Sequence, residues 1–238
     1  MTETMVPVIF DLDGTLVDPA GGITGGISSA LASLGLPVPD QPQLDAMVGP
    51  KLSDALETIA LVPKDLINEV ILRYRAKYRS TGIAQSKVYP GVRELLEVLS
   101  ASGRKVAVAT QKPQTMAHLV LEHHGIDKYF LAIRGSSDDE SASANSAPGK
   151  AEIVRAALAE LESSAAVMVG DRYQDVAGAS ANGLDCIGVR WGFAPEGELE
   201  EAGVSAVVST AEELRMKIEE LDAVYRATLS EVSTNGAI

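Results

Sequence analysis

The chain has 238 residues, of which 46% are hydrophobic and 22% charged, and its formal net charge is −13. These proportions are typical of a folded globular protein and exclude a disordered or fibrous chain. The negative charge and the lack of any block of Lys and Arg argue against a nucleic-acid polymer or an anionic membrane as partner. An acidic protein that binds an anion must supply cations locally, from a metal ion or a few basic side chains.

The sequence has none of the usual features of an exported or membrane protein. Cys186 is the single cysteine, so no intrachain disulfide can form, and residues 1–5 lack a basic segment followed by a long apolar run. No apolar stretch approaches the roughly 20 residues that a membrane helix needs. We therefore expect a cytoplasmic protein without a membrane partner, either a monomer or a homodimer.

The first strand-like segment is followed by a long stretch with a different pattern. Residues 6–10 form a continuous apolar run, which suits a strand buried on both faces of a parallel sheet. From about residue 18 to residue 89, apolar residues recur at helical spacing without strand-like runs. We predict a small all-helical cap domain at residues 18–89, inserted into an α/β core made of residues 1–17 and 90–238. Such an insertion can act as a lid over an active site.

The remainder of the chain alternates between helices and strands. Apolar residues recur at helical spacing at 92–99 and 153–161. Strand-like apolar runs lie at 106–109, 165–169, 187–189 and 206–208. Residues 136–149 are rich in Ser, Ala, Asp and Gly and indicate a mobile loop, and the last few residues are expected to fray. The alternation predicts an α/β fold with a Rossmann-like doubly wound parallel sheet.

Two acidic residues, Asp11 and Asp13, lie where the first strand ends. Strand alternation points both carboxylates the same way, and Gly14 permits a sharp turn. Mg²⁺ suits such oxygen ligands together with a phosphate oxygen. One carboxylate can attack phosphorus, while the other protonates the leaving oxygen and later deprotonates water. An EF-hand calcium loop is disfavoured, because it needs an acid or Asn at Thr15 and a Gly at Leu16.

Two later strand-like runs also end in polar residues. Thr110 ends the run at 106–109, and Asp171 follows the run at 165–169. In doubly wound sheets, ligands bind beyond the carboxyl ends of the strands. We therefore expect Asp11, Thr110 and Asp171 to share one site.

These residues occur in the order of four motifs that resemble those of the haloacid dehalogenase superfamily. Its phosphatase branch carries Asp-x-Asp-Gly-Thr, matched here from Asp11 onward. A Ser or Thr at the end of a later strand is matched by Thr110, and a Lys is matched by Lys150. The fourth motif is matched by Gly-Asp-Arg-Tyr-Gln-Asp, from Gly170 to Asp175.

The resemblance covers nearly the whole chain. The helical insertion is similar to the C1-type cap of the phosphoglycolate phosphatase-like group. Segments 48–50, 89–92 and 169–172 look similar to bacterial phosphoglycolate phosphatases and to a 5′-nucleotidase-like subgroup. The resemblance implies a Mg²⁺-dependent phosphatase that hydrolyses a small phosphorylated metabolite, phosphoglycolate-like or a nucleoside monophosphate, through an aspartyl-phosphate.

The resemblance also implies a role for each matched residue. Asp11 is the nucleophile and a metal ligand, and Asp13 is the general acid/base and binds the metal through its carbonyl. Thr110 and Lys150 stabilise the charge of the phosphoryl group. Asp171 completes the metal site, and Asp175 orients a metal-bound water or Lys150 from outside the ligand set.

Substrate contacts are expected from the loop after the second motif and from the cap. Gln111 stands where Ser or Asn often follows the second motif, and the loop before Lys150 is longer than usual. Among the basic residues of the cap, Lys51 follows a Gly-Pro turn, so we expect it on a loop that faces the core site. Trp191 and Phe193 are expected to pack against the core.

Other functions remain open on the sequence alone. Asp13 counts against a dehalogenase, which uses one acid at this motif, and a phosphonatase would need a Schiff-base lysine such as Lys51 or Lys64. A phosphosugar mutase or a pyrophosphatase on the same scaffold shares the acidic pair. A phosphate-accepting signalling module has adjacent rather than spaced acids and no helical insertion. A catalytically silent metal-binding protein is the last alternative.

Overall fold

The computed structural model describes residues 5–19, 21–138 and 149–235. Within these ranges, six parallel strands form the main sheet, in the order β5-β4-β1-β6-β7-β8. Their bounds are β1 (Val8–Phe10), β4 (Val106–Pro113), β5 (Ala132–Ser136), β6 (Val167–Gly170), β7 (Asp185–Val189) and β8 (Ala206–Val208). Val8 pairs with Val106 on one side and with Val167 on the other, so β1 lies between β4 and β6.

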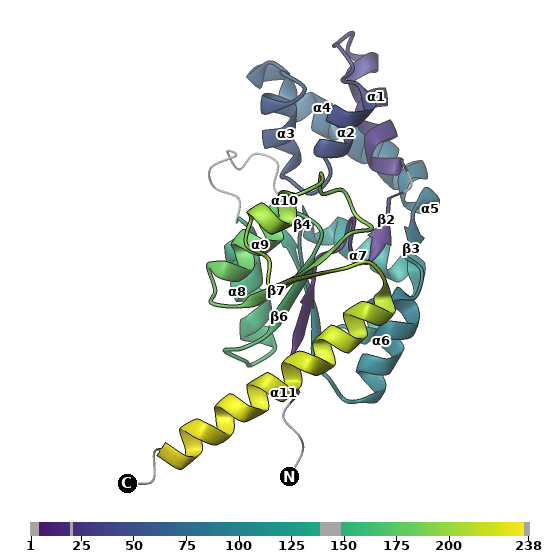
Figure 1. Cartoon of the computed structure of the whole chain (residues 1–238). Helices are drawn as coiled ribbons and strands as arrows, with labels where there is room; N and C mark the ends of the chain where they lie inside the picture. Colours follow the sequence, from purple (N-terminus) through teal and green to yellow (C-terminus); the bar gives the residue numbers. More distant parts are fainter. Residues whose placement is uncertain (1–4, 20, 139–148, 236–238) are drawn as a thin grey trace.

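Both faces of the sheet are covered by helices (Figure 1). Val8 and Phe10 of β1 belong to one apolar cluster, whereas Ile9 belongs to the other, because successive side chains of a strand point to opposite faces. The first cluster is covered by α6 (Val92–Ala101), α7 (Gln114–His124) and α11 (Ala211–Asn235). The second is covered by α8 (Lys150–Glu160), α9 (Tyr173–Ser180) and α10 (Glu198–Glu201).

The predicted doubly wound parallel sheet is confirmed. Strand β5, which the sequence analysis missed, lies at the edge of the sheet beside β4. Its sequence, Ala-Ile-Arg-Gly-Ser, has no continuous apolar run, because an edge strand is only partly buried. Residues 139–148 of the expected mobile loop, and the expected frayed end at 236–238, lie outside the described residues.

Helices without strands occupy most of the predicted cap. They are α1 (Gly22–Ser33), α2 (Gln41–Ala46), α3 (Leu52–Thr58), α4 (Lys64–Lys77) and α5 (Ile83–Gln85), with a π-helical turn at Tyr78–Gly82 before α5 and a 3-10 turn at Asp127–Tyr129 in the core. In Figure 1, α1 to α4 group together at one end of the molecule, away from α11. The division into residues 18–89 and a two-part core stays a prediction.

The ends of this helical segment are paired with each other. Strands β2 (Val17–Asp18) and β3 (Lys87–Val88) run antiparallel, with Val17 opposite Val88. The sequence analysis missed these strands, because two residues are too few to show an alternating pattern. The chain therefore enters and leaves the helical segment through one two-stranded ladder.

Helix α11 is attached to the core by a buried ion pair. Arg104 Nη1 and Nη2 donate to Asp222 Oδ1 and Oδ2 at 2.9 and 2.5 Å, and the two side chains are 3% and 6% exposed. The backbone N–H of Val6 also donates to Asp222 Oδ1, at 3.0 Å. One carboxylate thus joins the last helix, the segment before β1 and the loop before β4.

The substitution Asp222→Ala is expected to lower the free energy of unfolding by about 3–5 kcal/mol, because it leaves a buried guanidinium without its counter-charge. Urea unfolding at pH 7 measures this change. The substitution Glu219→Ala removes an exposed partner of Arg215 on the same helix, so the urea concentration at the unfolding midpoint should barely change. Equal effects of the two substitutions would contradict a structural role for the buried pair.

No helix among the described residues combines the length and the apolar character that crossing a membrane requires.

Candidate active site

Three strands bring the polar residues of the motifs to one edge of the sheet. Asp11 directly follows β1, Thr110 lies in the extended end of β4, and Asp171 directly follows β6. Since β4 and β6 flank β1, their carboxyl ends are adjacent. All three side chains are buried, and Asp171 is fully so. The three residues therefore lie at the same edge of the sheet, while their sharing of one site and their chemical roles stay predictions.

The turn after β1 is shaped to approach Asp171. Gly14 has a φ of +87°, which favours glycine, and a Cβ there would lie 2.2 Å from Asp171 Oδ2. The next residue, Thr15, donates from Oγ1 to Asp171 Oδ1 at 3.0 Å. The Gly-Thr pair of the first motif therefore holds the carboxylate of the fourth motif.

A loop after β7 holds the other oxygen of the same carboxylate. The N–H of Phe193 donates to Asp171 Oδ2 at 2.8 Å, and a Cβ at Gly192 would lie 2.3 Å from that oxygen. Trp191 Nε1 donates to the carbonyl of Thr15 at 3.1 Å. Trp191 and Phe193 pack against the core as expected. The backbone contact has no signature in the sequence, because every residue except proline carries an N–H.

Lys150 lies between two carboxylates at the start of α8. Its Nζ is 2.6 Å from Asp11 Oδ1 and 2.6 Å from Asp175 Oδ1. Burial alone would lower the pKa of Lys150, but the charges of Asp11 and Asp175 outweigh it and raise the pKa above its ordinary value. A Cβ at Gly178 would lie 2.7 Å from Lys150 Cγ, so α9 leaves room for the lysine. The lysine is therefore charged and fixed in place.

Asp11, Asp171 and Asp175 form a buried acidic cluster in which one carboxylate oxygen from each lies within 4.8 Å of the others. Burial and then the neighbouring acids raise the pKa of Asp171 well above its usual range. Burial also raises the pKa of Asp175, to about 6, although Lys150 opposes this. Such a cluster of carboxylates fits a hard divalent cation such as Mg²⁺, which would neutralise their repulsion.

Asp175 was predicted to support the metal site from outside the ligand set. Its Oδ1 pairs with Lys150, and its Oδ2 accepts the N–H of Arg172 at 3.0 Å. A Cβ at Gly170 would lie 2.2 Å from Asp175 Cγ. Asp175 is therefore close enough to bind a metal, and both of its oxygens already have protein partners, which fits the predicted supporting role.

Mg²⁺ is expected to raise the melting temperature of the wild-type protein, and to raise it much less in Asp171→Asn. A ligand that binds only the folded state stabilises it by about 2.7 kcal/mol at a hundred times its Kd. The gain should shrink as the pH falls, because the proposed ligand Asp171, whose pKa burial raises well above its usual range, then takes up a proton in place of the metal. Thermal melts with Mg²⁺ or with EDTA measure this. An unchanged Mg²⁺ response in Asp171→Asn would contradict the site, and Asp65→Asn, exposed on α4, is the matched control.

A second buried lysine, which the sequence analysis did not assign, contacts the other acid of the first motif. Lys112 Nζ is 2.7 Å from Asp13 Oδ2, and these two side chains are 6% and 10% exposed. Burial raises the pKa of Asp13, and the charge of Lys112 offsets part of the rise. Lys112 was missed because a lysine two residues beyond the second motif resembles an ordinary surface charge. Its position directly after the buried part of β4 was the available signal.

The predicted phosphate- and substrate-binding residues differ in their burial and in their contacts. Thr110 Oγ1 is buried and accepts the N–H of Lys112 at 3.2 Å. Gln111 is half-buried on β4. Lys51 is half-buried just before α3, three residues after Val48. The carbonyl of Val48 accepts a hydrogen bond from the Arg172 guanidinium, so the loop between α2 and α3 contacts the loop that carries Asp171.

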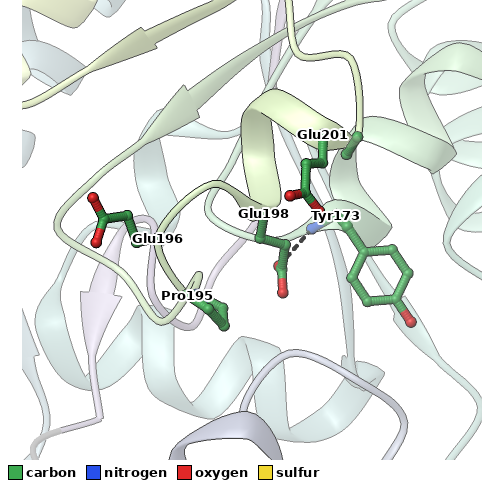
Figure 2. Close-up of a pocket in the computed structure, with 6 residues that line it drawn as sticks. Tyr173, Pro195, Glu196, Glu198 and Glu201 are labelled. Carbon is green, nitrogen blue, oxygen red and sulfur yellow. Dashed lines mark hydrogen bonds between the residues drawn. The ribbon is translucent and has the colours of Figure 1, made fainter.

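A hollow on the surface lies beside this site, but its lining does not suit an anionic substrate. Figure 2 shows its lining, which consists of Tyr173, Pro195, Glu196, Glu198, Glu201 and Ala202. The Glu198 carboxylate accepts the N–H of Tyr173 at 3.0 Å, marked by the dashed line in Figure 2, and pairs with Arg172 at 2.8 Å. The lining of the hollow contains three glutamates and no basic residue, whereas the buried acids are paired with Lys150 and Lys112, so we place the active site at the buried acids.

A family model described as haloacid dehalogenase-like hydrolase matches residues 8–189. The chain therefore belongs to the haloacid dehalogenase-like hydrolase family. A 5′-nucleotidase from Pseudomonas aeruginosa is 39% identical and is matched over 81% of this chain and 86% of its own length. The tyrosine-protein kinase PtkA of Mycobacterium tuberculosis is 37% identical and is matched over 87% of this chain and 70% of its own length.

Solved structures agree with these matches. The crystal structure of a predicted phosphatase from Clostridium acetobutylicum superposes with a TM-score of 0.83 and 36% sequence identity, covering 91% of this chain and all of that one. Proteins named phosphoglycolate phosphatase also match. The predicted resemblance is confirmed, and the protein is a phosphoric monoester hydrolase of this family.

Proposed function

We propose that the protein is a Mg²⁺-dependent phosphatase that hydrolyses a small phosphomonoester, phosphoglycolate-like or a nucleoside monophosphate, through an aspartyl-phosphate on Asp11. The observation that carries the proposal is the contact of a buried ammonium, on Lys150, with the carboxylate of Asp11 at 2.6 Å. Together with Asp171 and Asp175, these groups lie at the common carboxyl end of three parallel strands. Such a protein would act in the cytoplasm.

In the first step, a carboxylate oxygen of Asp11 attacks phosphorus, and the bond between phosphorus and the ester oxygen breaks. Asp13 gives a proton to the leaving oxygen, so the alcohol departs neutral. The product of this step is a phosphoryl group bonded to Asp11. The position of both acids in one turn after β1 supports this division of roles.

In the second step, a water molecule attacks the phosphorus of the aspartyl-phosphate. Asp13 takes the proton of this water, the bond between phosphorus and the Asp11 oxygen breaks, and inorganic phosphate leaves. Both residues are then in their starting states. Lys150 and the hydroxyl of Thr110 would donate to the phosphoryl oxygens, where negative charge increases in the transition state.

The acidic cluster would hold the metal. Asp11 and Asp171 would be its side-chain ligands, Asp13 would contribute its carbonyl, and Asp175 would keep Lys150 in place. When bound, Mg²⁺ supplies charge neutralisation between the carboxylates and an anionic substrate. The raised pKa of Asp171 supports this, since the site without a counter-ion disfavours three ionised acids.

The test is phosphate release from phosphoglycolate, nucleoside monophosphates, pyrophosphate and sugar phosphates, each with Mg²⁺ and with EDTA. We expect Mg²⁺-dependent release that is largest for phosphoglycolate or a nucleoside monophosphate. Largest release from pyrophosphate would replace the monoester assignment. Conversion of a sugar phosphate into its isomer without phosphate release would favour a mutase. No release from a folded, Mg²⁺-binding protein would overturn the proposal.

The sequence similarity to PtkA suggests a second reaction that should be assayed. That relative is named a tyrosine-protein kinase, and an Asp11 phosphoryl group could pass to a phenol instead of to water. Incubation with radiolabelled ATP, followed by detection of label on tyrosine, tests this second candidate. We expect phosphate release to exceed transfer to protein, because in the proposed mechanism Asp13 takes a proton from water.

A further inference from the structure

Two buried polar atoms near the acids have no hydrogen-bond partner among the described residues. One is Asp13 Oδ1, and the other is the hydroxyl of Tyr78, whose side chain is fully buried in the π-helical turn of the cap. Leaving a buried polar atom unpaired is unfavourable. A short π-helical segment is also often found at functional sites. Both atoms therefore keep a hydrogen-bonding capacity that no described residue satisfies.

Lys112 connects these two residues across the boundary between core and cap. Its Nζ is 2.7 Å from Asp13 Oδ2 and 4.5 Å from the centroid of the Tyr78 ring. Tyr74 stacks on Tyr78, with ring centroids 5.7 Å apart. The ammonium is thus held between an acid from the core and an aromatic ring from the cap. It carries three donors, and the carboxylate takes one of them.

The two buried lysines contact different parts of the proposed site. Lys150 pairs with Asp11 and Asp175, on the side where the phosphoryl group is transferred. Lys112 pairs with Asp13, the residue that would protonate the leaving oxygen, and it lies against the cap. The leaving group extends from that oxygen. It must therefore pass close to Lys112 and Tyr78.

We propose that Lys112 and Tyr78 form a leaving-group subsite that binds an oxygen on the carbon next to the ester carbon. This oxygen can belong to a carboxylate or to a hydroxyl, because an ammonium and a phenol donate to both. The inference rests on the proposed function, since it needs Asp13 to face the leaving oxygen. It makes Lys112 and Tyr78 determinants of specificity for that reaction.

The experiment compares two pairs of substrates that differ only in the group on the carbon next to the ester carbon. Phosphoglycolate is paired with ethyl phosphate, to test a carboxylate against a methyl group, and 1,2-propanediol 1-phosphate is paired with propyl phosphate, to test a single hydroxyl. The measured quantity is the ratio of kcat/KM within each pair, for the wild type, Lys112→Met and Tyr78→Phe. Any effect of Lys112→Met on the chemistry through Asp13 acts on both members, so it cancels in the ratio.

We expect the wild type to prefer the oxygen-bearing member of at least one pair. Lys112→Met should reduce that preference by about tenfold or more, mainly through KM, as a lost hydrogen bond to a charged group implies. Tyr78→Phe removes a single oxygen atom and should reduce the preference by about threefold. This variant should melt no lower than the wild type, because its hydroxyl has no partner in the free protein.

The proposal is overturned if both variants keep the wild-type ratios, or if Lys112→Met lowers kcat/KM equally for both members of each pair. The second result would mean that Lys112 only supports Asp13. A wild type that treats both members of both pairs alike would also overturn it. If Lys112→Met does not fold, the ratios of Tyr78→Phe decide. Failure of the proposed function is a different result, since the wild type would then release no phosphate from any substrate.

Discussion

The substitution Asp11→Asn is expected to lower phosphate release by at least about a thousandfold, the size of effect produced by removing a nucleophile. An amide cannot form the phosphoryl bond, although it has nearly the same shape as the carboxylate. Asp11 is buried and pairs with Lys150, so its replacement also removes a counter-charge of that lysine. Initial rates at saturating substrate and Mg²⁺ measure the loss. Labelling with a radioactive substrate, followed by acid quenching, measures phosphoryl-enzyme formation.

The control is Asp65→Asn, which makes the same chemical change at an exposed position of the cap. It should keep the wild-type rate and form the labelled intermediate. Circular dichroism must show that both variants are folded. A rate in Asp11→Asn within tenfold of the wild type would refute the nucleophile assignment, whatever substrate the protein prefers.

The substitution Lys150→Met is expected to lower both activity and stability. Turnover should fall by about a hundredfold to a thousandfold, as seen when one electrostatic donor to a transition state is removed. Methionine keeps much of the apolar stem but leaves Asp11 and Asp175 without their shared cation. In EDTA at pH 7.5, we expect the free energy of unfolding to fall by about 3–5 kcal/mol.

The stability loss should be smaller at pH 5 than at pH 7.5. The pKa of Asp175 is about 6 in the folded protein, above the ordinary value for aspartate, so the folded state takes up this proton more readily than the unfolded state does. The proton bound to Asp175 stabilises the folded state fully below the ordinary pKa of aspartate, and this stabilisation is lost as the pH rises through about 6. Removing Lys150 raises this pKa further, so acid should partly restore the variant.

Urea unfolding at the two pH values tests this prediction, with Lys64→Met as control. Lys64 is 83% exposed and pairs with Glu57 on the surface of the cap. Its loss should leave activity and stability near those of the wild type. An equal stability loss in Lys150→Met at both pH values would show that the lysine acts by packing rather than by charge.

The arrangement of the main acids could be predicted from the sequence because parallel strands impose it. Asp11, Thr110 and Asp171 each end an apolar run, and three neighbouring parallel strands bring their carboxyl ends together. Lys150 was predicted only through its place in a motif order, since the sequence does not fix how a loop and a helix start approach a site. The contact with Asp11 comes from the packing of α8 beside α9, where Gly178 leaves space.

Other parts of the site lie beyond sequence reasoning for physical reasons. Tyr78 follows the apolar spacing of the cap helices, so it resembled an ordinary core residue. Only the three-dimensional fold places its ring over Lys112. The hydrogen bond from Phe193 to Asp171 uses a backbone N–H, which has no signature in the amino-acid letters. The ends of the buried strands β1 and β6 could be predicted from their apolar runs, whereas these two contacts, which depend on the packing of a helix and a loop, could not.

The ladder of β2 and β3 has a consequence for how this protein can be modified. Val17 and Val88 face each other across the ladder, so the points where the helical segment departs and returns are about 5 Å apart. A tight hairpin turn spans the same gap, and so would the ends of a different insert. The helical segment is therefore exchangeable: a chimera that grafts another cap between Val17 and Val88 should keep the chemistry of the core while acquiring a new choice of substrate.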